Sequence, residues 1–398
     1  MSIDVAHVTD SIEFQMSLLL FMALGGYLLS NKLRQPAVIG VILAGVLIGP
    51  SALNLIHYSD FVASIGHIGA IILLFVIGLE FKIKEITKPS YFLIALGGIV
   101  LPWIGGYAVA VAFGFPFAKA IIISVALTAT SIAITADTLR EMGKLKSEAA
   151  QAIIGAAIID DVLALFALAV AQQLSHGTIS APEMAIFAAK AFVFLIGGAL
   201  IGGKIITPII HKIDGSAITD KYPDFIFILV MMVAFLYAML AEVMSLSAIV
   251  GAFIAGVSLE RVQTMKSKDF RTGAEYIRII FGSIFFISLG VLADFSNFSF
   301  NALYFALALS VVAILSKLIG CGFFAKISGL SNRDSLAVGV GMSPRGEVAM
   351  TIALLAFTSG VIEQPAFVGL IMMSLITTMV APLLLKNVIY KEQSHVQS

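Results

Sequence analysis

The sequence predicts an all-α protein that crosses a lipid bilayer many times. Of its 398 residues, 60% are hydrophobic and only 12% are charged, and the mean hydropathy is +1.04, whereas soluble domains carry about 25% charged residues. Apolar runs recur at lengths near the roughly 20 residues that a helix needs to span a bilayer. Basic residues gather in every second connection between those runs, which is the pattern of a multi-spanning membrane protein.

The apolar runs define thirteen predicted membrane-spanning helices joined by short connections. The second, ninth and tenth are short, so we expect them to be extended at their ends or tilted differently from the others. The predicted ranges are 12–30, 37–49, 61–79, 91–113, 117–136, 149–172, 183–210, 224–242, 245–259, 277–292, 301–324, 335–358 and 365–385.

The positions of lysine and arginine test this count. Twenty of the 24 Lys and Arg residues lie in the connections that lead from an odd-numbered to an even-numbered predicted helix, at the helix ends that border these connections, or in the C-terminal tail. Only Lys119 lies in a connection on the opposite side. Because basic residues stay cytoplasmic, we expect the N-terminus outside and the C-terminus in the cytoplasm. The first residues lack the basic stretch of a cleavable signal. The net charge of zero gives no reason to expect a nucleic-acid partner.

Two predicted helices, 117–136 and 335–358, carry helix-interrupting residues at mid-depth. The first contains Thr128-Ala129-Thr130-Ser131, and the second contains Gly341-Met342-Ser343-Pro344-Arg345-Gly346-Glu347. They stand seven apart in the order of helices and therefore run in opposite directions, so segments 1–6 and 8–13 form two inverted six-helix repeats. Paired interruptions of this kind indicate the ion or substrate site of a transporter. For the first run alone, hydroxyl groups that bond back to their own helix are an alternative.

Each interruption also contains candidate capping residues. We expect Ser343 to cap the second half of its segment, with Pro344 at the first helical position and Glu347 in the first turn. Thr130 or Ser131 is expected to cap the second half of the other broken segment.

Two adjacent aspartates, Asp160 and Asp161, lie in the middle of the sixth apolar run. A charged side chain at membrane depth costs about 2.5–3.5 kcal/mol on insertion scales, so the pair indicates a site that binds and releases cations or protons. The alternative is a packing role in which neighbours satisfy both acids. Lys317, deep in the eleventh segment, needs a counter-charge. Because successive helix residues point about 100° apart, we expect one aspartate to pair with Lys317 while the other faces a water-filled cavity.

Four further residues are assigned less specific roles. Arg345 and Glu347 are charges at the second interruption that pair with each other or with partners outside it. Glu80 ends the third predicted helix and is interpreted as an interfacial acid, with a gating charge as the alternative. Cys321, the single cysteine, lies in an apolar run and is interpreted as a small packing residue.

The broken helices and the buried charges resemble those of the cation:proton antiporter superfamily. The likeness covers essentially the whole chain and is strongest to the second branch, the NapA-type sodium/proton antiporters. The double aspartate is similar to that of the electrogenic members, whereas electroneutral relatives usually carry Asn in place of the first Asp. The residues that carry the resemblance are Thr130, Ser131, Asp160, Asp161, Lys317 and the run Pro344-Arg345-Gly346-Glu347.

The resemblance implies a role for each of these residues. It implies that Asp161 is the ion-binding carboxylate, that Asp160 is the partner of Lys317, and that both aspartates lie at the sodium site. It places Thr130 and Ser131 at the crossing of the broken helices. The implied domains are a dimerisation domain (12–80 and 224–292), a linker helix (183–210) and a core (91–172 and 301–386). The core moves like an elevator against the scaffold of a homodimer.

The implied function is an electrogenic antiporter that exchanges cytoplasmic Na⁺ or Li⁺ for external protons by alternating access. It would work in the plasma membrane of a prokaryote and need no cofactor beyond the transported ions. A potassium/proton exchanger, a sodium-coupled symporter on the same plan and a cation channel are the alternatives. An intramembrane aspartyl protease needs two aspartates on separate helices and a Gly-x-Gly-Asp motif. Neither feature is found in the sequence, so we expect a transporter and not an enzyme.

Overall fold

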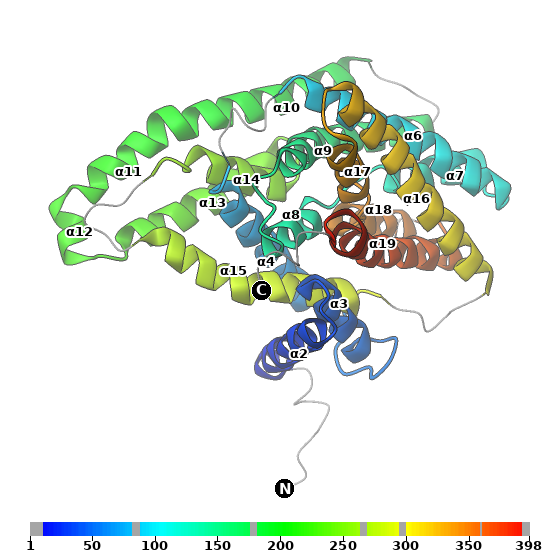
Figure 1. The fold of residues 1–398 in the computed structure, drawn as a ribbon, viewed down its shortest axis with the longest axis horizontal. Coiled ribbons are helices and arrows are strands. Elements are labelled where there is room, and N and C mark those ends of the chain that lie inside the picture. The colour runs from blue at the N-terminus through cyan, green and yellow to red at the C-terminus, as the bar shows by residue number, and fades with distance from the viewer. Residues whose placement is uncertain are drawn as a thin grey trace, which may run out of the picture. The chain divides into compact units, whose positions relative to one another are not determined.

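The computed structural model describes residues 11–81, 88–175, 181–262, 269–293, 300–358 and 360–391. Every regular element in these ranges is a helix (Figure 1), so the predicted all-α class is confirmed. Among the described residues, eight helices are long and apolar enough to cross a membrane by length and composition, and three apolar helices are shorter. The count of thirteen crossings, the inverted repeat and the placement of the termini stay predictions.

Helices occupy each of the thirteen predicted ranges, and the 183–210 range holds three consecutive elements, α10, η1 and α11. The 117–136 and 335–358 ranges are each divided into two. The elements are α2 (Ile12–Lys32), α3 (Ala37–Ile48), α4 (Asp60–Gly78), α6 (Ser90–Ala112), α7 (Phe117–Ala126), α8 (Ile132–Glu141), α9 (Glu148–Ser175), α10 (Ala181–Ile201), η1 (Gly202–Ile206), α11 (Thr207–Asp214), α12 (Ala217–Lys221), α13 (Phe225–Val243), α14 (Ala248–Ser258), α15 (Phe270–Val291), α16 (Phe300–Ile327), α17 (Asn332–Gly341), α18 (Glu347–Thr358), α19 (Gln364–Leu384) and η2 (Leu385–Ile389).

Two boundaries differ from the prediction for identifiable reasons. α15 begins at Phe270 and not at residue 277, because Phe270 and Ala274 are buried and extend its apolar face by two turns through a polar stretch. The segment predicted as 183–210 continues to Asp214, since the single π-helical turn η1 joins α10 to α11 without ending the helical path.

The chain divides into two compact units. The first consists of Met1–Ala63, Lys88–Ile179 and Phe286–Ser398, and the second consists of Ser64–Thr87 and Ser180–Phe285. The first unit contains α2 and α3, which were predicted to belong to the dimerisation domain, together with the helices of the predicted core. The predicted dimerisation, linker and core domains stay predictions.

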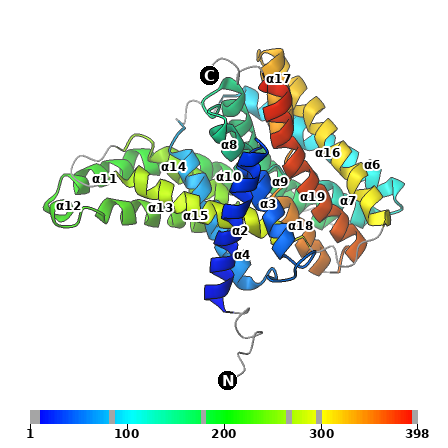
Figure 2. The same ribbon diagram turned by 60° about the horizontal axis from the view of Figure 1, so that its bottom comes forward.

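Within the first unit, α16 lies against α6 and α19, as Figure 2 shows. The contact of α6 with α16 depends on glycine, since a Cβ added at Gly97 would lie 2.9 Å from the Gly320 carbonyl oxygen. α2 and α3 approach closely in the same way, because a Cβ at Gly26 would lie 2.6 Å from the Gly40 carbonyl oxygen. Small residues permit such backbone contacts between helices in membranes.

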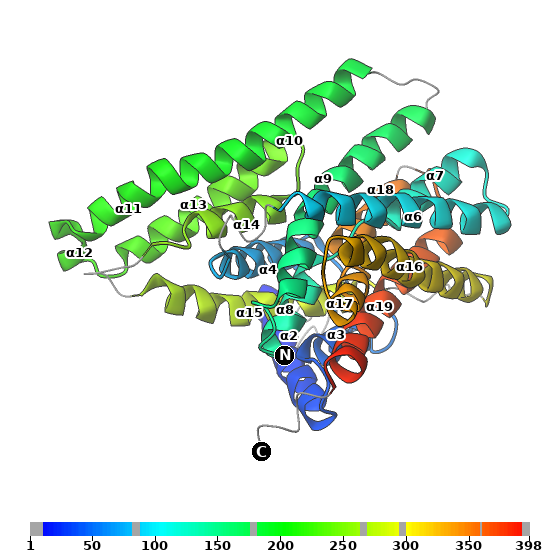
Figure 3. The same cartoon turned by 45° about the horizontal axis from the view of Figure 1, so that its top comes forward.

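The second unit contains α10 to α14 and most of α4 and α15. Figure 3 shows α13 beside α14 in this unit, and α10 also packs on α14. The Tyr237 hydroxyl of α13 donates a hydrogen bond to the Gly198 carbonyl of α10 at 2.8 Å. Arg271, at the start of α15, donates to the Leu79 carbonyl at 3.0 Å and also to the Glu260 carbonyl.

The last described residues are held in the first unit by Tyr390. Its ring lies beneath two cations, with the Arg333 guanidinium carbon 5.3 Å and the Lys144 ammonium 5.9 Å from the ring centre. Arg333 also donates from Nε to the Ile389 carbonyl at 2.7 Å. Burial raises the pKa of Tyr390, so its hydroxyl stays neutral at physiological pH. These contacts connect the C-terminal end to the segment after α8 and to the start of α17.

Candidate functional site

The site is built where two helices are interrupted. Residues 127–131 separate α7 from α8, and residues 342–346 separate α17 from α18. In the first interruption the Thr128 hydroxyl donates to the Val125 carbonyl at 2.7 Å, which is the local bonding expected of a hydroxyl near a helix end. Polar backbone at this depth is tolerated where it is buried in protein.

The two interruptions hydrogen-bond to each other. The Ser131 amide donates to the Pro344 carbonyl at 2.9 Å, and the Thr130 hydroxyl donates to the Met342 carbonyl at 3.2 Å. A Cβ added at Gly346 would lie 2.5 Å from the Ser131 hydroxyl oxygen, so the backbones meet closely. Thr130 and Ser131 therefore lie at the meeting point of the two broken helices, where the resemblance placed them.

The predicted caps are corrected by the structure. Ser343 does not cap α18, because its hydroxyl donates to the Gly339 carbonyl of the preceding half-helix at 2.8 Å. α18 begins at Glu347, so Pro344 lies before the helix and not at its first position. Ser131 does occupy the N-cap position of α8, but its side chain makes no capping hydrogen bond there.

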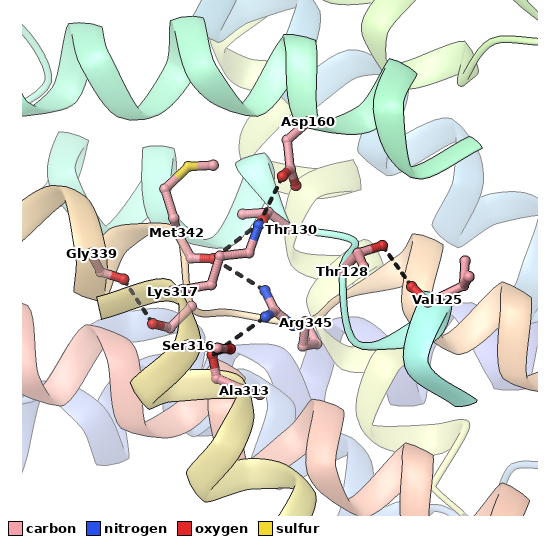
Figure 4. A network of polar contacts seen from close by, with 11 residues as sticks. Val125, Thr128, Thr130, Asp160, Ala313, Ser316, Lys317, Gly339, Met342 and Arg345 are labelled. Atoms are coloured by element: carbon pink, nitrogen blue, oxygen red, sulfur yellow. Dashed lines mark hydrogen bonds and ion pairs between the residues drawn. The ribbon is translucent and has the colours of Figure 1, made fainter. Parts of the chain in front are cut away.

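The predicted ion pair between Lys317 and Asp160 is confirmed. The ammonium of Lys317 on α16 lies 2.8 Å from Oδ1 of Asp160 on α9, and both side chains are fully buried. Figure 4 shows this pair above the two interruptions, with Thr130 close by. Two opposite charges taken out of water together stabilise each other and still carry a large desolvation cost.

Asp161 follows on the next helical position and is also buried, with 4% of its surface exposed. It points about 100° away from Asp160 around α9. One turn further along α9, Ala164 belongs to a buried apolar cluster with Ile99, Ala129 and Ala349. Trp103 and two other hydrophobic residues pack against this cluster. The expected water-filled cavity at the Asp161 carboxyl group stays a prediction.

Arg345 is the second buried cation. Its guanidinium donates to the Met342 carbonyl at 3.1 Å and to the Ala313 carbonyl of α16 at 3.4 Å, as Figure 4 shows. Its backbone is held by α19, because its amide donates to the Thr377 hydroxyl at 3.1 Å and its carbonyl accepts from the Thr378 hydroxyl at 2.9 Å. The described partners of this side chain are therefore carbonyl oxygens and not a carboxylate.

Two predicted residues, Glu347 and Glu80, are not part of this network as it is described. The side chain of Glu347 is not among those described, so its pairing stays a prediction. Glu80 is half-buried after the end of α4, in the second unit. Within the described residues no three His, Cys, Asp or Glu side chains come together to hold a metal. The sodium site at Asp160 and Asp161 stays a prediction.

Sequence reasoning missed the threonines that support the second interruption. Thr377 and Thr378 are adjacent hydroxyl residues inside an apolar helix, and that polar pair was the available signal. Thr135 was also missed; its hydroxyl donates to the Gly341 carbonyl at 2.6 Å. A threonine in a helix ordinarily bonds to its own turn, so only the structure reveals that this one bonds to the other broken helix.

Comparisons with known proteins agree with the geometry. A family described as "Sodium/hydrogen exchanger, transmembrane" matches residues 18–390. The chain is 34% identical over 376 residues to the Na⁺/H⁺-K⁺ antiporter GerN of Bacillus cereus, with 94% of this chain and 95% of that one covered. It is 32% identical to the high-affinity Na⁺/H⁺ antiporter NhaS3 of Synechocystis sp., with 88% and 84% covered.

The fold is also similar to a solved structure. The sodium proton antiporter MjNhaP1 from Methanocaldococcus jannaschii superposes with a TM-score of 0.66 at 18% identity, over 93% of this chain and 94% of that one. The predicted superfamily is confirmed by these matches, which are compatible with its second branch. They identify the protein as a membrane transporter that exchanges cations for protons. The chain belongs to the transmembrane sodium/hydrogen exchanger family.

Proposed function

We propose that the protein is an electrogenic antiporter that exchanges cytoplasmic Na⁺ or Li⁺ for external protons. The observation that carries the proposal is the buried ion pair of Lys317 and Asp160, with Asp161 beside it, where two broken helices meet. Asp161 is the carboxylate that holds the transported ion. Hydroxyl and carbonyl oxygens at the interruptions supply further ligands, because oxygen ligands suit a hard cation.

The exchange is a competition between sodium and protons for one site. Ionised Asp161 holds a partly dehydrated sodium ion, and protonation of the site removes the charge and releases the ion. Sodium and protons therefore cannot occupy the site together. Alternating access then requires only that the site move when it is loaded with one or the other.

The buried charges explain why protons leave as sodium arrives. Ionised Asp160 and Asp161 balance protonated Lys317 and Arg345, so these four groups together carry no net charge. A sodium ion adds one positive charge to a region where each uncompensated ion costs several kcal/mol. Loss of the Lys317 proton restores the balance. If Lys317 and Asp161 both exchange protons during the cycle, more than one proton moves per sodium ion and net charge crosses the membrane.

A potassium/proton antiporter is the second candidate function. It is favoured by the names of two similar proteins, the Na⁺/H⁺-K⁺ antiporter GerN and the K⁺/H⁺ antiporter subunit KhtU of Bacillus subtilis, which is 25% identical to this chain. A cation channel would differ from both, because ions would flow downhill without a fixed number of protons in exchange.

The predicted assembly belongs to the same proposal. The protein would act as a homodimer in the plasma membrane of a prokaryote, with the N-terminus outside and the C-terminus in the cytoplasm. The dimerisation domain (12–80 and 224–292), the linker (183–210) and the core (91–172 and 301–386) would be its working parts. Glu80 and Glu347 are proposed as gating or structural charges.

Reconstitution in liposomes tests the function. The purified protein is sealed in vesicles with a pH-sensitive dye, a pH gradient is imposed, and sodium, lithium or potassium is added in turn. We expect sodium and lithium to move protons and potassium to move few. A response to potassium as large as that to sodium would favour the second candidate, and cation flux without proton movement would favour a channel.

A further inference from the structure

The residue opposite the Lys317–Asp160 ion pair is a glycine on α6. A Cβ added at Gly98 would lie 3.0 Å from the Lys317 ammonium nitrogen, 3.4 Å from Asp160 Oδ1 and 2.7 Å from the Cys321 sulfur. The first two distances are those of direct contact with the ion pair. The α carbon of Gly98 therefore covers the pair on the side of α6.

The close approach of the two helices is what places Gly98 there. Gly97 and Gly320 meet backbone to backbone one residue before Gly98 and Cys321, and α6 packs along α16 over much of its length. Lys317 and Cys321 are four residues apart, so they share the face of α16 that lies against Gly98. The ammonium is thus confined between α6, α9 and its own helix.

This confinement leaves the ammonium with few partners. In the part of the chain that the structure describes, its hydrogen bond goes to Asp160 Oδ1, although an ammonium has three N–H donors. The titratable groups that surround it are Asp160 from α9, Cys321 from α16 and Arg345 from the second interruption. On the side of α6, the ammonium faces the CH₂ group of Gly98, which neither donates nor accepts a conventional hydrogen bond.

We propose that Gly98 is a positioning residue for exchange, because its lack of a side chain keeps the Lys317 ammonium on Asp160. A methyl group at this position would have to displace the ammonium or the Cys321 thiol. If the ammonium moves, the electrostatic balance at Asp160 and Asp161 changes, and with it the competition between protons and sodium. This inference rests on the proposed function, since it assumes that the ion pair takes part in exchange.

The test compares four variants with the wild type in proteoliposomes: Gly98→Ala, Gly105→Ala, Cys321→Ala and the double variant Gly98→Ala/Cys321→Ala. The readout is the pH profile of sodium-driven proton movement. Gly98→Ala should move the midpoint of the profile by about half a pH unit or more, since displacing a neighbouring charge changes proton binding. Gly105→Ala is the matched control on the same helix. Its Cβ would meet only Val312, at 2.5 Å, and no charged group. It should leave the midpoint unchanged.

The double variant combines Gly98→Ala with Cys321→Ala and provides a rescue. Removing the sulfur opens space for the new methyl group, so Lys317 returns to Asp160 and the profile returns to that of Cys321→Ala alone. A purely structural role for Gly98 would change the amount of folded protein and not the midpoint.

Two results would overturn the proposal. One is an unchanged midpoint in Gly98→Ala vesicles that still exchange. The other is failure of Gly98→Ala and of the double variant to fold while Gly105→Ala folds, since this would assign Gly98 to packing alone. Absence of sodium-driven proton movement in the wild type would instead contradict the proposed function. The two failures are therefore distinguished by the wild-type control.

Discussion

Replacement of Lys317 by methionine tests how the buried ion pair contributes to stability. At 2.8 Å and an effective dielectric constant of about 20, the attraction between the two charges is about 6 kcal/mol. Desolvation of each ion costs several kcal/mol and offsets most of that attraction. The net contribution of the intact pair is therefore close to zero. Loss of one partner is different, because it leaves a buried charge without compensation.

We expect Lys317→Met to lower the free energy of unfolding by about 3–5 kcal/mol, which is the usual cost of breaking a buried pair. Asp160→Asn should also destabilise the protein, since Lys317 then lacks its counter-charge. The double variant should lie within about 1 kcal/mol of the wild type, because no unpaired charge remains. The effects of the two substitutions will thus be strongly non-additive.

Unfolding can be followed in mixed micelles by the fluorescence of the single tryptophan, Trp103, which packs against the apolar cluster near Asp161. Lys119→Met is the matched control. It removes the same chemical group from an ion pair with Glu363 in which the Lys119 and Glu363 side chains are 27% and 76% exposed. Its effect should be much smaller than that of Lys317→Met, because water screens a partly exposed pair. If the double variant loses as much stability as the two single variants summed, the charges act independently and the reasoning is refuted.

Four further predictions concern the site and its surroundings. Asp161→Asn should abolish sodium-driven proton movement while the protein still inserts and dimerises, and wild-type rates in a folded variant would remove Asp161 from the ion site. Collapse of the membrane potential with valinomycin and potassium should change the exchange rate, whereas indifference of both rate and final gradient to an imposed potential would indicate electroneutral exchange. Tyr390→Ala should cost about 2–4 kcal/mol of unfolding free energy, through lost ring burial and two cation–π contacts. Tyr390→Phe keeps both, so an equal loss in that variant would contradict the explanation. The Lys119 ammonium lowers the pKa of Glu363, so the small stabilisation from this pair is present above the ordinary carboxyl pKa and is lost as the pH falls through the lowered value. Glu363→Gln should remove that part of the pH dependence of thermal unfolding.

The sequence alone predicted the ion pair, the helical ranges and the interruptions, because charged or helix-breaking residues in apolar segments have few possible explanations. Lys317 requires a counter-charge because a buried ammonium is costly, and the aspartate pair was the evident partner. The helical ranges followed from apolar length, and the interruptions followed from Pro344 and the threonine-rich run. The choice of Asp160 over Asp161 came from the family resemblance, since helical geometry alone allows either.

Hydrogen bonds from side chains to backbone carbonyls at the interruptions could not be predicted. Arg345 bonds to carbonyls made available by the interrupted α17 and to one on α16, and no sequence pattern specifies which carbonyls are left free. Ser343 bonds backward for the same reason, because the end of α17 offers an acceptor within reach. The role inferred for Gly98 has no signal in one sequence at all, since a glycine in an apolar helix indicates only a close approach, not the group approached.

The arrangement at the end of α17 supports the proposal that a transported cation binds at the aspartates and not at the helix terminus. The C-terminal end of a helix carries a partial negative charge on its unbonded carbonyls. Here the Met342 carbonyl accepts from the Arg345 guanidinium and from Thr130, and the Gly341 carbonyl accepts from Thr135. These donors, one of them a fixed charge, already compensate the negative end. Asp160 is already paired with Lys317, so in the proposed mechanism Asp161 is the carboxylate that attracts the mobile cation. If that is so, selectivity should depend on how closely Asp161 and the neighbouring oxygens can surround the ion.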